Sequence, residues 1–228
     1  NKNKKIWAET CALLWRKIPN FMNLMNNPKA IHVIRDPRAV ILSFKKETRY
    51  KPPAYLGSAF NSVDAMNSII KHKEMYKKRF TYIRYEDLVK DKDYEMKKIF
   101  KFLNIYPITK YNQNNFKDEK NKKWIVNSSF QKNISRPFDY DCIQGNSLWK
   151  KKLSFDEINF VETICEKYMN YFGYKRTSKK NMKKNKIQKL IGKKYDLFKA
   201  YKNWDKSNHR VGFQRFPANP LDRKTWTR

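Results

Sequence analysis

The chain has 228 residues and a mass of 27.7 kDa, enough for one domain of ordinary size with a buried core. Its three cysteines are too few for a disulfide scaffold, so a reducing compartment is tolerated and we expect a cytoplasmic location. The longest purely aliphatic run, Ala39 to Leu42, is far too short to span a membrane.

The net charge is +31, from 52 basic and 21 acidic residues. Lysine and asparagine together make up 63 of the 228 residues, a bias typical of A-rich codon usage. This explanation competes with a nucleic-acid or membrane-surface role. The charge is also uneven, because Tyr174 to Arg228 holds 18 basic and only 3 acidic residues. We therefore divide the chain into a main part, 1–174, and a Lys-rich, partly helical tail, 175–228.

The first interpretable element is a short apolar run, Ile31 to Ile34, which predicts a strand. The next residues are typical of a helix start, since Asp36 suits the N-cap and Pro37 the first helical position. A strand followed at once by a helix is therefore expected here.

Strands and helices then alternate. We expect a helix from Tyr55 or Phe60 to Tyr76, a strand over Phe80 to Tyr85, and a helix over Tyr94 to Leu103. This alternation predicts an α/β fold with a parallel sheet. Asn104 to Asn146 has a weak, polar pattern and is expected to be a long irregular excursion.

The clearest predicted helix runs from Ser154 to Phe172. Ser154 and Glu157 have the spacing of a capping box, and Gly173 follows at the position where helices often end on glycine. In the tail, one further helix is expected near Ile187 to Tyr201.

Arg35 and Ser43 are the first residues that indicate chemistry. Arg35 follows a predicted parallel strand, and ligands of open α/β sheets gather at the carboxyl ends of strands. A guanidinium beside a helix start, whose free N–H groups and dipole also favour anions, suits a phosphate or sulfate. The alternative is structural: Arg35 pairs with Asp36 or another acid, and Ser43 merely fills its helix.

Four segments, in the same order along the chain, resemble blocks of the sulfotransferases that use 3′-phosphoadenosine 5′-phosphosulfate (PAPS). Lys29 to Phe44 resembles their 3′-phosphate-binding motif, in the Arg-Asp-Pro-Arg-Ala-Val form typical of the carbohydrate-type and bacterial branches. The others are Tyr82 to Leu88, Asn127 to Phe130 and Ser147 to Lys150. The resemblance covers about Ile6 to Tyr174.

This resemblance implies a three-layer sandwich like that of P-loop nucleotide-binding proteins, with a central parallel sheet. It implies transfer of a sulfuryl group from PAPS to a hydroxyl acceptor, a carbohydrate. Arg35 and Ser43 would hold the 3′-phosphate, and Tyr85 would contact the adenine region. The further cofactor-binding residues that it implies are Ser128, Ser129, Phe130, Trp149 and Lys150. Structural alternatives stay open, because Tyr85 could cap a strand and Trp149 could anchor the last helix.

The sequence departs from the family pattern in one important place. The family's phosphosulfate-binding loop is absent, since no Gly-Thr-Thr occurs in the chain. The chain opens on Asn1 rather than Met, so we expect an N-terminally truncated domain that lacks the first strand and this loop, and that is inactive or nearly so by itself. Glu9 is the candidate catalytic base, with a solvated helix glutamate as the alternative.

The histidines give no support for catalysis. His32 is interior to a strand and is expected to be structural, whereas His72 and His209 are expected in solvated, Lys-rich surroundings. No His, Cys or Asp cluster has the spacing of metal ligands, so no metal is expected.

Two other functions compete with sulfuryl transfer. One is non-catalytic binding of a polyanion or nucleic acid by the basic tail, with a steep salt dependence. The other is a nucleotide kinase of related fold, which would need a Gly-rich Walker loop that is equally absent. No specific nucleic acid, and no membrane span in this segment, is expected.

Overall fold

The computed structural model describes residues 14–46, 53–106 and 147–207. Within these ranges none of the helices is long and apolar enough to cross a membrane. The elements, in chain order, are η1 Leu14–Arg16, α1 Ile18–Leu24, β1 Ala30–Ile34, α2 Pro37–Lys46, η2 Ala54–Leu56, α3 Gly57–Tyr76, η3 Lys77–Arg79, β2 Phe80–Arg84, α4 Tyr85–Lys90, α5 Lys92–Leu103, α7 Trp149–Lys152, α8 Phe155–Tyr171, α9 Lys184–Ile191 and α10 Tyr195–Lys206.

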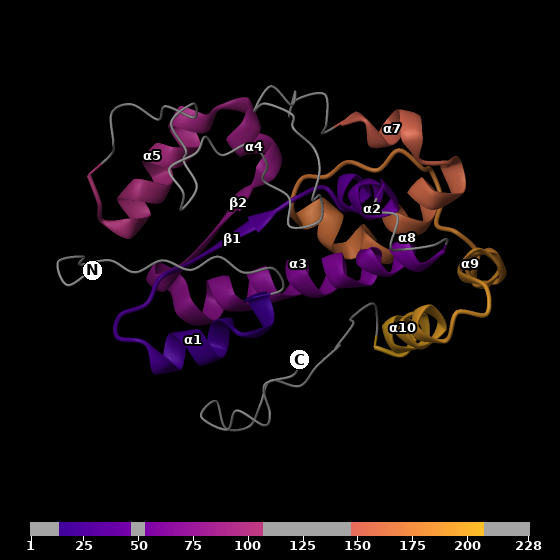
Figure 1. Cartoon of the computed structure of the whole chain (residues 1–228), viewed down its shortest axis with the longest axis horizontal. Coiled ribbons are helices and arrows are strands. Elements are labelled where there is room, and N and C mark those ends of the chain that lie inside the picture. Colours follow the sequence, from indigo (N-terminus) through magenta and orange to yellow (C-terminus); the bar gives the residue numbers. More distant parts are fainter. Residues whose placement is uncertain (1–13, 47–52, 107–146, 208–228) are drawn as a thin grey trace, which may run out of the picture.

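The two described strands form a parallel sheet. β1 pairs with β2 from Ala30 opposite Phe80 to Ile34 opposite Arg84, although α2, η2, α3 and η3 lie between the strands along the chain. In Figure 1 the strands lie between α4 and α5 on one side and α1 and α3 on the other. The predicted α/β class with a parallel sheet is therefore confirmed.

The hydrophobic core is built mainly on α3, the longest helix. α2, α8 and α10 all contact α3, and α2 also contacts α8. The largest side chains that are almost fully buried come from these helices, from η2 and from α9: Ile41, Leu56, Phe60, Met66, Ile69, Phe160, Ile164, Tyr168, Met169, Ile187, Ile191 and Tyr201. This core fixes α2 and α8 relative to the sheet.

The predicted helix ends agree with the structure. Asp36 accepts a hydrogen bond from the Arg38 amide at 2.9 Å, and α2 begins at Pro37. Ser154 and Glu157 form the reciprocal bonds of a capping box at the start of α8. Gly173 follows α8 with a φ of +73°, a conformation that suits glycine.

The tail differs from the prediction of a single helix. Two helices, α9 and α10, replace it, because Gly192 ends α9 in a left-handed conformation with φ +60°. Both helices bury apolar side chains in the common core, among them Ile187, Ile191 and Tyr201. The boundary at residue 174 stays a prediction, but 175–207 packs on the rest of the molecule.

The prediction that His72 is solvated is wrong. Its side chain is only 3% exposed and lies 5.5 Å from the Phe80 ring, edge to face. The cause is helical spacing: His72 shares the inward face of α3 with Ile69 and Tyr76, while the lysines beside it in sequence face outward. His32 occupies the structural position predicted, where its ring stacks on Trp15 at 5.9 Å. His209 lies outside the described residues.

Candidate active site

Arg35 and Tyr85 meet at the carboxyl edge of the sheet. Each directly follows its strand, and the last strand pair is Ile34 with Arg84, so the two chains leave the sheet side by side. The Arg35 guanidinium carbon lies 4.5 Å from the centre of the Tyr85 ring. This separation is that of a cation–π contact. Two residues predicted for the site are therefore in direct contact.

The Arg35 guanidinium has no polar partner within the described ranges. Its Nε atom is buried there without a hydrogen bond, and no ion pair is formed with Asp36 or any other described acid. A buried donor left unpaired costs free energy that a ligand oxygen would recover. The structural alternative, in which Arg35 pairs with Asp36, does not hold. Among the described residues, no acid occupies the Arg35 guanidinium.

Arg38, three residues after Arg35, already uses its guanidinium in contacts within the protein. Its guanidinium donates to Asp36 at 2.7 and 3.0 Å, to Glu162 at 2.6 Å and to the Lys175 carbonyl at 2.9 Å. It also lies 3.9 Å from the centre of the Trp149 ring. Only 4% of the Arg38 side chain is exposed, so this arginine joins α2, α7, α8 and the residues after α8 instead of serving a ligand.

Glu162 completes this buried network. Its carboxylate is fully buried and accepts hydrogen bonds from Arg38, Thr177 and Ser178. Burial by itself raises the pKa of Glu162, but the bonds from Ser178 and Thr177 outweigh it and hold that pKa below its ordinary value. Glu162 is therefore a charged partner for Arg38 near neutral pH.

The start of α2 offers less to an anion than the sequence suggested. The Asp36 carboxylate already caps the Arg38 amide, and Pro37 has no N–H to donate. The Asp36 amide is also occupied, because it donates to Glu86 Oε1 at 2.8 Å. Among the described groups, the start of α2 therefore adds little to the Arg35 side chain as a ligand for an anion.

Glu86 is a residue that the sequence reasoning missed. It joins the two strand ends, accepting from the Asp36 amide through Oε1 and from the Tyr174 hydroxyl through Oε2 at 2.9 Å. Burial and the Glu86 carboxylate both raise the pKa of Tyr174. The available signal was its position in the Tyr82 to Leu88 segment, two residues after the end of β2.

Ser43 lies on α2, two turns beyond Arg35, with an exposed side chain that has no hydrogen-bond partner among the described residues. Trp149 is 3% exposed and lies against Arg38. It therefore occupies a packing position, which was the alternative to binding the cofactor. Lys150 is exposed, with its amino group 5.7 Å from the Trp149 ring centre. A cofactor contact of any of these three stays a prediction.

The other predicted site residues lie outside the described ranges. These are the candidate base and the predicted adenine-binding segment, namely Glu9, Ser128, Ser129 and Phe130. Among the residues that are described, no group of His, Cys, Asp or Glu side chains could hold a metal ion.

Comparison with known proteins gives one family. The family model described as "Sulfotransferase domain" matches residues 17–173. Carbohydrate sulfotransferase 1 from Danio rerio is 24% identical, with 72% of this chain and 42% of the relative covered. The Homo sapiens protein of the same name is 23% identical, with 72% and 43% covered. The chain thus spans less than half the length of these curated relatives.

One solved structure is also similar in fold. The sulfotransferase domain from the curacin biosynthetic pathway matches with a TM-score of 0.49 and 18% sequence identity. The match covers 68% of this chain and 56% of that domain.

Proposed function

Because the chain belongs to the sulfotransferase domain family, we propose that it binds PAPS at the carboxyl edge of β1 and β2 and serves sulfuryl transfer to a hydroxyl group of a carbohydrate. The family match supports the reaction class. The carbohydrate acceptor is supported by the names of the curated relatives at 22–24% identity.

The observation that carries this proposal is the unpartnered Arg35 guanidinium. It lies at the sheet edge where α/β proteins bind ligands, and its Nε atom is buried without a partner among the described residues. A guanidinium binds phosphate oxygens in a two-pronged geometry. The residues present therefore fit a ligand that carries a phosphate dianion, as the 3′-phosphate of PAPS does.

Ser43 and Tyr85 have distinct parts in this proposal. Ser43 carries an exposed hydroxyl on α2 that can donate to a phosphate oxygen. Tyr85 has one face of its ring covered by Arg35, so this face is not open to a base. We propose that the Tyr85 ring packs against the planar Arg35 guanidinium and fixes its orientation. Tyr85 is then a positioning residue, which acts on the ligand through Arg35.

When bound, PAPS supplies the sulfuryl group. The chain's own contribution at the described edge is to bind and orient the donor and to balance its negative charge, which favours in-line displacement. Glu9 stays the proposed base that takes the acceptor proton.

Calorimetric titration with 3′-phosphoadenosine 5′-phosphate tests this proposal. Hydrogen bonds to charged groups contribute about 1.5–3 kcal/mol each, so Arg35→Ala should weaken binding at least tenfold. Arg79→Ala is the matched control, because Arg79 directly precedes β2 at the opposite edge of the sheet. It removes the same charge and should leave the affinity nearly unchanged. Equal effects of the two substitutions, or none from Arg35→Ala, would show that the site lies elsewhere.

A further inference from the structure

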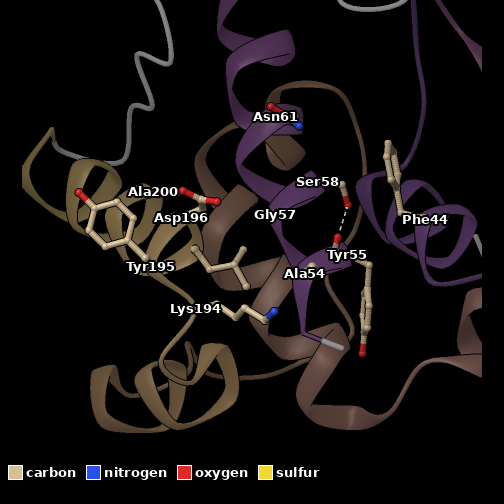
Figure 2. Close-up of a pocket in the computed structure, with 11 residues that line it drawn as sticks. Phe44, Ala54, Tyr55, Gly57, Ser58, Asn61, Lys194, Tyr195, Asp196 and Ala200 are labelled. Carbon is tan, nitrogen blue, oxygen red and sulfur yellow. Dashed lines mark hydrogen bonds between the residues drawn. The ribbon is translucent and has the colours of Figure 1, made fainter. Parts of the chain in front are cut away.

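A cavity of about 380 Å³ lies between the start of α3 and the first turn of α10. Its volume is in the range of small-molecule sites, about 300–1,000 Å³. Phe44 of α2, Tyr55 of η2 and Ser58 and Asn61 of α3 line one side, and Lys194 and Asp196 line the other (Figure 2). The cavity is separate from the sheet edge where Arg35 lies.

The two walls are held together by a close contact beneath the cavity. A Cβ atom at Gly57 would lie 3.2 Å from Leu197 Cδ2, so glycine allows α10 to approach the start of α3. Leu197, Ala200 and Tyr201 of α10 are buried in the core, and α10 contacts α3. The cavity is thus bounded by two packed helices.

The α10 wall carries two opposite charges without partners. Within the described ranges, neither Lys194 nor Asp196 makes a hydrogen bond or ion pair, and both side chains are exposed to solvent. In Figure 2 both lie on the side of α10 that faces Gly57, whereas the Tyr195 hydroxyl points away from it. The Lys194 ammonium offers three N–H donors and the Asp196 carboxylate offers acceptor oxygens, and the two charges sum to zero.

The α3 wall adds apolar surface and limited polar capacity. Phe44 and Tyr55 contribute aromatic rings, and the Tyr55 hydroxyl is already bound to Glu157, so Tyr55 offers mainly its ring. Ser58 donates to the Tyr55 carbonyl at 2.7 Å, which leaves its oxygen free to accept. Asn61 accepts from Arg16 at 3.2 Å and keeps its own amide N–H groups.

We propose that this cavity binds an uncharged sugar unit of the acceptor. A neutral ring with several hydroxyl groups can donate to Asp196, accept from Lys194 and place its C–H face on aromatic carbon. The Asp196 carboxylate would repel an anion, and the Lys194 ammonium would repel a cation. For a ligand with net charge, the attraction to one side chain is therefore offset by repulsion from the other. This inference rests on the proposed carbohydrate acceptor.

The cavity lies away from the end of β1, where Arg35 lies. Phe44 lies in the last turn of α2, a helix of ten residues and hence about 15 Å long, whereas Arg35 precedes its first turn. The wall formed by α10 also lies beyond residue 173, where the family match ends. The two charged side chains of the cavity, Lys194 and Asp196, therefore lie outside the part of the chain that the family model matches.

Titration of the protein with single sugars, followed by NMR, tests the subsite. The neutral probes are glucose, galactose, mannose and N-acetylglucosamine, and the charged probes are glucuronate and glucosamine. At least one neutral sugar should bind more tightly than both charged ones. Asp196→Ala and Lys194→Ala should each weaken that binding at least fivefold. Lys202→Ala, an exposed position on α10 outside the cavity lining, is the matched control and should have no effect.

The inference is overturned if no neutral sugar binds, if a charged sugar binds best, or if the Lys202 variant matches the Asp196 variant. Affinity for 3′-phosphoadenosine 5′-phosphate is measured on the same variants and should not change. If the original protein shows no preference for a neutral sugar but binds the nucleotide, only the subsite is refuted. Absent nucleotide binding refutes the proposed function, whatever the sugars do.

Discussion

At the scale of single residues, the contact between Arg35 and Tyr85 has a measurable consequence. A cation–π contact contributes about 0.5–2 kcal/mol, so Tyr85→Leu should weaken binding of 3′-phosphoadenosine 5′-phosphate roughly 2- to 30-fold. Tyr85→Phe keeps the ring and should bind nearly as well as the original protein. Calorimetry on both variants measures the difference.

The same contact predicts non-additive effects. If Tyr85 acts by orienting Arg35, then Tyr85→Leu should add little once Arg35 is replaced by alanine. Full additivity in this double-mutant cycle would mean that Tyr85 touches the nucleotide independently of Arg35.

Two histidines, His72 buried and His32 partly buried, make stability sensitive to acid. Burial lowers the pKa of His32 and of His72 to about 4, with additional repulsion from His72 on His32 and from Lys71 on His72. In the unfolded chain both titrate near their ordinary value of about 6.5. Between these values the unfolded state binds more protons, so the free energy of unfolding should fall as the pH falls from about 6.5 to 4.

The variant His72→Phe tests this cause. Phenylalanine keeps an aromatic ring against Phe80 but cannot be protonated, so urea unfolding should show a shallower loss of stability across pH 4–6.5. An unchanged pH profile would assign the acid sensitivity to other groups.

The sequence predicts the surroundings of single residues only in part, because many contacts join residues that lie far apart along the chain. The choice of Arg35 as the candidate ligand residue stays a prediction. The sequence could not show that the Arg38 guanidinium is already bound within the protein, because its partner Glu162 lies 124 residues away. The same holds for His72, whose neighbours in sequence are lysines while its neighbours in space are aromatic rings.

At the scale of elements, the link between Arg38 and Glu162 fixes α2 against α8. Removing one partner of a buried ion pair costs about 3–5 kcal/mol, so Glu162→Gln should lower the free energy of unfolding by about 3 kcal/mol. Glu166→Gln is the matched control on the same helix, because Glu166 is 41% exposed and pairs with Arg176 at the surface. Its cost should be below about 1 kcal/mol. Equal melting shifts for both variants would contradict this assignment.

Short sequence motifs predicted the helix starts that are fixed by hydrogen bonds between neighbouring residues. Asp36 with Pro37 marked the start of α2, and Ser154 with Glu157 marked the start of α8. The tail was harder, since its Lys-rich composition hides a narrow apolar stripe whose partners lie on α3 and α8. Trp204, for example, donates to the Ile164 carbonyl at 3.0 Å.

At the scale of the whole molecule, the packing of 175–207 changes how a polyanion-binding role must be tested. Deleting the chain beyond Lys175 would remove α9 and α10 from the core, so loss of binding after such a cut would carry no information. Replacing exposed lysines avoids this problem. Lys183, Lys189 and Lys193 are exposed and have no polar partner among the described residues.

The triple replacement of these lysines by glutamine should separate two kinds of binding. Attraction to a polyanion such as heparin should weaken and lose salt dependence, because fewer counterions are released. Affinity for 3′-phosphoadenosine 5′-phosphate should stay unchanged, since Arg35 is intact. A parallel loss of both affinities would place the nucleotide on the tail.

The most direct test of the central claim isolates the 3′-phosphate. Calorimetry compares 3′-phosphoadenosine 5′-phosphate with adenosine 5′-monophosphate, which lacks only that group. The original protein should bind the first nucleotide at least tenfold more tightly, and Arg35→Ala should abolish this preference while it leaves the weaker affinity for the monophosphate in place. A preference that survives in Arg35→Ala would contradict the assignment of Arg35 to the 3′-phosphate.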